Sequence, residues 1–308
     1  KNLLFALLLA LGAGFVFTAC DRSPAEDPIK GTIETIRANP DLSTFLAALE
    51  RSDLTSRLDS GSLTLFAPSN AAFTTFLTAN GYQRLEDVPV ANLKQILLYH
   101  VTSGIVRAEN IPQGYLASLA NFGLDLNVKL FFRTVGDWLV SGVPVVQGGI
   151  HTTEGLVYIV DRVVPLPDLI KGLQNDPAFS TFLLALTRSD LDIDYLATLS
   201  GPGPFTVLAP TDPAFAELFA ELGYANLDAI PKDALNAILQ YHVVPAVNLT
   251  RNDIGFLSQV TSLSGKKITI DPGYQFTDTQ GRTAAFTRPD IQTSNGVIHA
   301  ISKVLLPN

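Results

Sequence analysis

The feature that most constrains the fold of this 308-residue chain is an internal repeat. Residues 63–101 match residues 205–243 at a constant offset of 142, with 15 identities in 39 positions and no gap. Upstream the offset is 137, and downstream, where Gly155 matches Gly296, it is 141. The second copy therefore gains five residues near 196–204. Two copies of about 140 residues predict two domains, because a solenoid would use shorter and more numerous units.

Helical patterns dominate the first part of each copy. An apolar stripe with spacing i, i+3, i+4, i+7 follows Pro40 and recurs in the second copy. Asn70 and Asp212 are expected to cap the next helix at its N-terminus, and Gly81 and Gly223 its C-terminus. The two stripes are Leu42, Phe45, Leu46 and Leu49, and Phe179, Phe182, Leu183 and Leu186.

Strand patterns dominate the later part of each copy. The short apolar run Leu63–Ala67, stopped by Pro68, predicts a buried strand. Alternation over residues 128–140 around a Val-Gly-Asp turn predicts a hairpin. Both copies close on apolar strands, within Leu156–Val164 and Val297–Leu306. Helices first and strands later predict an α+β fold.

Three motifs that occur in both copies resemble the fasciclin (FAS1) domain family over nearly all of residues 29–308. They are the phrase around Phe66-Ala67-Pro68 and Leu208-Ala209-Pro210, the Tyr-His pairs, and the closing Asn295-Gly296-Val297-Ile298-His299. The resemblance implies two tandem fasciclin-like domains, each a wedge-shaped β-sandwich with attached helices. The first copy departs from the family at Glu154, where Asn is usual, and the second copy at Ser302, where Asp is usual.

The N-terminus resembles a bacterial lipoprotein signal. Residues 1–19 are expected to be a signal peptide, because the apolar run is too short for a permanent membrane span. Phe17-Thr18-Ala19-Cys20 resembles a lipobox, which implies that Cys20 is lipidated, although Phe17 departs from the usual aliphatic residue. The alternative is an ordinary signal with an incidental cysteine.

These features predict a domain order and a location. Residues 20–28 then form a tether, residues 29–165 domain 1 and residues 166–308 domain 2. The expected location is the cell envelope, with the protein lipid-anchored to a membrane and facing the periplasm or the exterior.

Composition excludes several classes of function. The net charge of −8 argues against nucleic acid as a partner, because nucleic-acid binding requires a basic face. Hydrophobic residues make up 47% and charged residues 16%, which excludes a largely disordered chain. The single cysteine allows no disulfide within the chain, so each domain must be held by core packing.

Catalytic and metal-binding signatures are lacking in the sequence. No nucleophile elbow, phosphate-binding loop or dinucleotide fingerprint occurs, so neither an enzyme nor a cofactor is predicted. The four histidines share no local motif, so no metal site is expected. Asp190, Asp192 and Asp194 begin like a calcium loop, but Tyr195 stands where glycine is required and Gly201 where a bidentate Glu is required. A solvated helix end is the preferred interpretation.

Two groups of aromatic and histidine side chains are the candidate binding residues. The pairs Tyr99-His100 and Tyr241-His242 allow two interpretations, namely a polar contact for a partner or histidines hydrogen-bonded in the core. The family resemblance associates this region with adhesion.

The other candidate is Trp138, which clusters with Phe131 and Phe132 in the first copy only. At least one of these two phenylalanines is expected to point to the opposite face of its strand. Trp138 is therefore either a second packed layer or an exposed contact for a sugar or protein. A large loss of melting temperature in Trp138→Ala would place it in the core.

Taken together, the sequence predicts a non-catalytic adhesion module that binds a surface glycan or protein and reaches the membrane through its lipid anchor. A short link, Val164 to Pro167, predicts a restricted orientation between the copies. Alternatives are a carrier of a small hydrophobic ligand, a hydrolase of envelope polymers and a structural envelope component.

Overall fold

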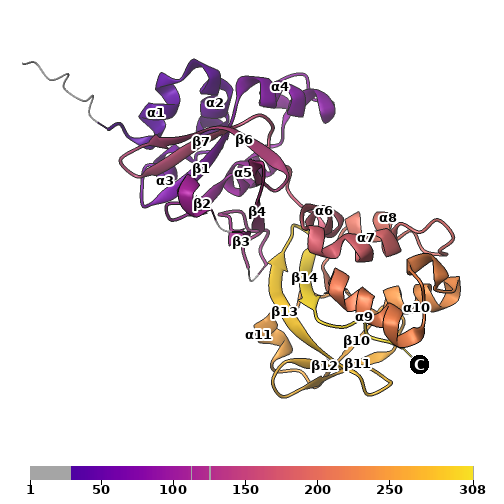
Figure 1. Ribbon diagram of the computed structural model, residues 1–308. Coiled ribbons are helices and arrows are strands. Elements are labelled where there is room, and N and C mark those ends of the chain that lie inside the picture. The colour runs from indigo at the N-terminus through magenta and orange to yellow at the C-terminus, as the bar shows by residue number, and fades with distance from the viewer. Residues whose placement is uncertain (1–28, 112, 125, 308) are drawn as a thin grey trace, which may run out of the picture.

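The computed structural model describes residues 29–111, 113–124 and 126–307. It contains two domains, each built from one seven-stranded sheet and a set of helices (Figure 1). The predicted α+β fold with two tandem domains is thereby confirmed. The predicted signal peptide, Cys20 and the tether lie outside the described residues.

The helices of domain 1 precede most of its strands. Its helices are α1 (Thr32–Ala38), η1 (Pro40–Leu42), α2 (Ser43–Arg51), α3 (Thr55–Leu58), α4 (Asn70–Ala79), η2 (Leu85–Asp87), α5 (Val90–Tyr99) and η3 (Ala108–Asn110), where η marks a 3-10 helix. Its strands are β1 (Leu63–Pro68), β2 (Val101–Ser103), β3 (Gly114–Ala117), β4 (Lys129–Val135), β5 (Asp137–Val140), β6 (Val143–His151) and β7 (Gly155–Val160).

Domain 2 repeats this order. Its helices are α6 (Leu169–Asn175), η4 (Pro177–Phe179), α7 (Ser180–Leu186), α8 (Tyr195–Ser200), α9 (Asp212–Leu222), η5 (Leu227–Ala229), α10 (Lys232–Tyr241) and α11 (Arg251–Ile254). Its strands are β8 (Phe205–Pro210), β9 (Val243–Pro245), β10 (Gln259–Thr261), β11 (Lys267–Asp271), β12 (Gln275–Thr277), β13 (Thr283–Gln292) and β14 (Gly296–Ile301).

Each sheet is folded over so that its two ends approach each other. The strand order is β2-β1-β7-β6-β5-β4-β3 in domain 1 and β10-β11-β12-β13-β14-β8-β9 in domain 2. The bulged strand β6 pairs first with β5 and then with β7, so it belongs to both layers. A bridge between Thr102 and Ser118 joins the region of β2 to that of β3. In domain 1 the layers thus enclose one core, whereas the buried hydrophobic residues of domain 2 form two clusters.

Each sheet contains a parallel pair one strand in from its end, β1 with β7 and β8 with β14. All six residues of β1 are buried, as expected for a parallel strand covered on both faces. Gly155 must remain glycine, because a Cβ there would lie 1.8 Å from the Leu63 carbonyl oxygen. In the same way, a Cβ on Gly296 would lie 2.3 Å from the Phe205 carbonyl oxygen. This close approach explains why both copies carry the glycine.

The prediction that Asn70 and Asp212 cap their own helices is wrong. Ser69 caps α4, because its side chain accepts the Ala72 N–H. The Asn70 side chain instead accepts the Thr44 N–H at 2.9 Å, at the start of α2. Asp212 makes the equivalent bond to Thr181 N at 2.7 Å. Each residue therefore joins two helices that are distant in sequence.

Candidate functional site

The two Tyr-His pairs lie in the cores of their domains, with all four side chains fully buried. The Tyr99 hydroxyl donates to the Lys129 carbonyl at 3.0 Å, and the Tyr241 hydroxyl donates to the Lys267 carbonyl at 2.7 Å. No partner can touch these side chains in the folded protein. The structure therefore places both pairs in the core, which agrees with the interpretation of hydrogen-bonded core histidines rather than with that of a contact for a partner.

Each histidine ties the end of a helix to the last segment of its domain. His100 Nδ1 lies 2.7 Å from the Ile96 carbonyl oxygen, and Nε2 accepts the Val164 N–H at 2.8 Å. A neutral ring protonated on Nδ1 satisfies both contacts. His242 does the same with Ile238 and Leu305. Burial lowers the pKa of both histidines to about 4, so neither ring carries charge at neutral pH.

Trp138 is half-buried and packs against the core of domain 1. Its ring centre lies 4.4 Å from that of Tyr158 and 5.9 Å from that of Phe66, both edge-on. Phe132 joins this cluster, whereas Phe131 lies against Tyr115 outside it. The two phenylalanines thus point to opposite faces of β4, as predicted. The geometry supports the packed-layer interpretation of Trp138.

The three aspartates that resemble the start of a calcium loop have separate partners. Asp190 pairs with Arg188 and Asp192 with Lys232, while Asp194 accepts the Ala197 N–H at the start of α8. Within residues 29–307 as described, no group of three His, Cys, Asp or Glu side chains could hold a metal ion. Over the same part of the chain, no helix has the length and apolarity that crossing a membrane requires.

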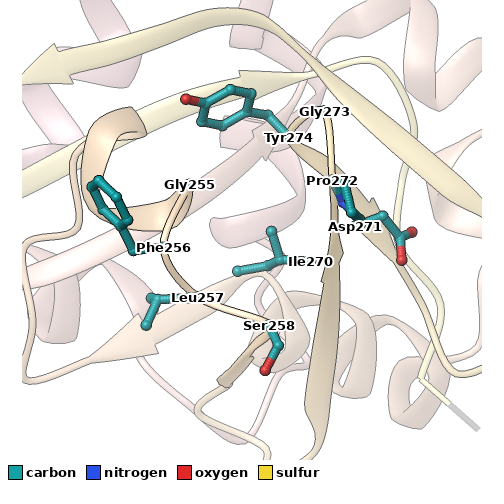
Figure 2. Close-up of a pocket in the computed structure, with 9 residues that line it drawn as sticks. All are labelled: Gly255, Phe256, Leu257, Ser258, Ile270, Asp271, Pro272, Gly273 and Tyr274. Atoms are coloured by element: carbon teal, nitrogen blue, oxygen red, sulfur yellow. The ribbon is translucent and has the colours of Figure 1, made fainter.

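A surface pocket of about 400 Å³ in domain 2 is the better candidate for a binding site (Figure 2). The loop 255–258, which follows α11, forms one side, and the turn 271–274 between β11 and β12 forms the other. Ile270 lies between them (Figure 2) and is itself buried. Phe256 stands on the loop with 84% of its surface exposed. We call this site the Phe256 pocket.

Local contacts hold both walls of the Phe256 pocket in place. The Ile270 N–H donates to the Ser258 carbonyl at 2.8 Å, which joins loop and strand. Tyr274 adopts a left-handed backbone with φ of 64°, which a non-glycine residue rarely does. The Arg251 guanidinium lies 4.4 Å from the centre of the Tyr274 ring. Gly255 lies so close under that ring that a Cβ would approach Tyr274 to 2.8 Å.

Sequence patterns alone do not indicate this pocket. Phe256 and Leu257 resemble any apolar pair near a strand, and nothing local shows that Phe256 points to solvent. The left-handed Tyr274 follows Pro272-Gly273, which predicts a turn but not its function. The pocket arises because the fold places the loop beside the turn.

Comparisons with known proteins agree with the repeat and with the fold. A model of the fasciclin domain matches residues 40–167 and again residues 177–307. A solved FAS1 domain pair from the insect cell adhesion molecule fasciclin I covers 87% of this chain and 98% of its own, with a TM-score of 0.55 and 20% identity. This structural likeness concerns the fold alone.

Two relatives illustrate the similarity in sequence. The transforming growth factor-beta-induced protein ig-h3 of Sus scrofa is 26% identical over 290 residues, which are 92% of this chain and 41% of ig-h3. The cell surface glycolipoprotein MPB83 of Mycobacterium bovis is 34% identical over 148 residues, which are 46% of this chain and 62% of MPB83. The chain thus spans less than two thirds of either relative.

Proposed function

The chain belongs to the fasciclin domain family, and on that premise we propose that it is a non-catalytic adhesion module that binds a surface glycan or protein. The observation that carries the proposal is Phe256, 84% exposed at the mouth of a pocket of about 400 Å³. Exposed aromatic side chains beside a concavity are typical of contact surfaces, where they supply most of the binding energy. The names of the relatives, a cell surface glycolipoprotein among them, support this proposal.

The chemistry of the Phe256 pocket suits a ligand with both an apolar face and polar groups. Phe256 and Leu257 offer apolar surface, since both are exposed. The Asp271 carboxylate accepts the Thr277 hydroxyl, which leaves further lone pairs for a ligand donor. A sugar ring and an aromatic or aliphatic side chain of a protein both meet this description.

The test is binding of residues 29–308 to a glycan array and to whole cells, with Phe256→Ala beside the unchanged chain. We expect the substitution to weaken binding about tenfold or more, roughly 1.4 kcal/mol. The melting temperature should stay nearly unchanged, because an exposed side chain contributes little to stability. Leu184→Ala is the matched control, since Leu184 is an apolar residue of the same domain with 63% exposure.

The outcomes separate the possibilities. Binding that is lost in Phe256→Ala and retained in Leu184→Ala assigns the contact to the pocket. Binding that both variants retain would move the contact elsewhere on the surface. A folded sample that binds neither glycans nor cells would contradict the adhesion proposal.

Membrane attachment through a lipid on Cys20 is a separate part of the proposal. It is supported by the lipobox-like sequence before Cys20 and by the lipoprotein among the relatives. Two acyl chains would anchor the protein stably, whereas one chain is marginal. The full chain should partition with membranes and take up labelled fatty acid, and Cys20→Ala should do neither.

A second candidate function, carriage of a small hydrophobic ligand, is favoured by a different cavity. A pocket of about 360 Å³ lies between α10 and the C-terminal segment, with mostly apolar lining. Leu222 and Ala237 line it, whereas copy one has Asn80 and Gln95 at these positions. Native mass spectrometry would show a bound small molecule, which Ala237→Gln should remove if the carrier function holds.

A further inference from the structure

Three polar side chains from the two domains meet at the junction between them. The Tyr115 hydroxyl, on β3 of domain 1, donates to Asp176 Oδ2 of domain 2 at 3.0 Å. Arg288 Nη2, on β13, lies 2.5 Å from the same carboxylate oxygen. Figure 1 shows the β3 side of domain 1 facing domain 2. One carboxylate thus joins a phenol of one domain to a guanidinium of the other.

The environment of this cluster strengthens the contact. Asp176 is only 3% exposed, so water screens its charge little. The Arg288 guanidinium lies 5.5 Å from the ring centre of Tyr115 and 5.7 Å from that of Phe179. Phe131 lies against the Tyr115 ring at 4.8 Å. Burial, with the Asp176 charge, raises the pKa of Tyr115, so the phenol keeps its proton and remains a donor.

Because the domains are repeats, each junction residue has an equivalent in the other domain. These equivalents lie at the two free ends of the domain pair, which face away from the junction. Asn39 precedes η1 as Asp176 precedes η4, and each side chain caps the 3-10 helix that follows. Gln147 and Arg288 occupy the same step of the bulged strands β6 and β13. Register along β3–β4 and β10–β11 makes Tyr115 equivalent to Gln259 and Phe131 equivalent to Thr269.

Neither free end can repeat the junction. Domain 1 presents an uncharged amide at Asn39 and an exposed amide at Gln147, where domain 2 has the carboxylate and the guanidinium. Domain 2 presents exposed Gln259 and Thr269, where domain 1 has two aromatic rings. A head-to-tail contact available at both ends would generate open filaments. The residues at the free ends remove that possibility.

We propose that Tyr115, Asp176 and Arg288 form an interdomain lock that holds the two domains as one rigid body. The different residues at the equivalent positions restrict this contact to one per chain. The lock goes beyond a short linker, because a linker limits only the distance between domains. Two directional contacts cross the junction, from the Tyr115 hydroxyl to Asp176 and from the Arg288 guanidinium to the Tyr115 ring, and together they fix the orientation. A fixed orientation would present the Phe256 pocket in one direction relative to domain 1.

Distances between spin labels on the two domains test the lock. Residues 29–308 contain no cysteine, so Asn92→Cys and Ala234→Cys introduce the two label sites. Both residues are exposed and equivalent, on α5 and α10. We expect a single narrow distance distribution for the doubly labelled chain. A broad distribution would overturn the proposal.

The lock residues are then replaced by those of the other copy, with Tyr115→Gln, Asp176→Asn and Arg288→Gln combined. Asn39 shows that asparagine can cap this helix, since it accepts the Asp41 N–H as Asp176 accepts that of Ala178. We expect the narrow peak of the distance distribution to be lost, while the circular dichroism spectrum and the mobility of each spin label stay as in the unchanged chain.

Gln147→Ala, at the free end, is the matched control and should leave the narrow peak unchanged. A narrow peak that survives in the triple variant would show that other contacts fix the orientation, and the lock would be rejected. If the triple variant loses its folded spectrum, Tyr115→Gln alone, which leaves the Asp176–Arg288 ion pair in place, decides by the same two criteria.

Discussion

At the scale of single residues, His100 and His242, two of the three buried histidines in the described part of the chain, have the same structural role in the two domains. Each holds the last segment of its domain through an accepted backbone N–H, from Val164 in domain 1 and Leu305 in domain 2. The bond requires an unprotonated Nε2, because a charged imidazole has no acceptor. The Tyr-His motif, which the family resemblance associates with adhesion, therefore has a structural function in this fold.

This arrangement predicts acid-sensitive stability. Burial lowers the pKa of His100 and His242 to about 4 in the folded state, from the ordinary value of 6.5 for a histidine exposed to water. The unfolded chain therefore binds protons first, so the free energy of unfolding is highest above about pH 6.5 and falls as the pH drops towards 4. Each histidine should contribute a loss on the order of 3 kcal/mol.

Urea denaturation between pH 7 and pH 4 measures this loss. His100→Gln should be less stable at pH 7 and should lose less stability on acidification, because one titrating group is gone. His151→Gln is the control, since His151 is exposed on β6. Equal pH slopes in the two variants would refute a role for His100 in the acid response.

Trp138 gives a second prediction at this scale. Its ring packs edge-on against Tyr158 and Phe66, so Trp138→Ala should leave a cavity and cost about 3 kcal/mol of unfolding free energy. Trp138→Phe should cost under about 1.5 kcal/mol, because it keeps an aromatic ring and gives up an indole N–H that has no hydrogen-bond partner. Thermal melting of both variants measures the difference, and an unchanged melting temperature in Trp138→Ala would instead favour a surface contact.

At the scale of elements, sequence patterns predict the strands and turns that depend on interactions between residues close together in the chain. The buried strand that begins at Leu63 and the hairpin around Gly136 both occur as expected, because periodicity and turn residues act over a few positions. The sequence predicts that Asn70 caps α4, but its side-chain oxygen accepts the N–H of Thr44 in α2, 26 residues upstream. A local pattern cannot show which of two helix N-termini a side chain will reach.

The candidate site was the least predictable part for the same reason. Phe256 is apolar, and its exposure follows from the loop's place beside the turn at Tyr274 rather than from its neighbours in sequence. Tyr115 meets Asp176 across 61 positions. The sequence could only indicate, from the minimal linker, that the domains hold a restricted orientation, and spin-label distances test that prediction.

At the scale of the whole molecule, the two copies share a fold and differ in what they expose. Domain 1 packs Trp138 into an aromatic cluster, whereas domain 2 carries the Phe256 pocket. The junction residues differ between the inner and the outer ends of the pair. The two domains thus share one fold, but their residues differ at equivalent positions. As a result, the junction contact forms once within the chain and cannot form at its two free ends.

This asymmetry leads to a gain-of-function prediction. Replacing the free-end residues by their junction counterparts should allow one chain to dock onto the next, with Asn39→Asp and Gln147→Arg on domain 1 and Gln259→Tyr and Thr269→Phe on domain 2. A linked contact works at effective concentrations in the millimolar range, so association between chains should appear only near about 1 mM. Sedimentation velocity should then show head-to-tail oligomers of increasing size, which dissociate on dilution.

The control is the chain with only the two domain 2 changes. It should stay monomeric, because the new aromatic rings at its domain 2 end meet no carboxylate and guanidinium on the domain 1 end of another chain. A fourfold variant that also stays monomeric at that concentration would mean that the junction depends on the linker and not on these side chains.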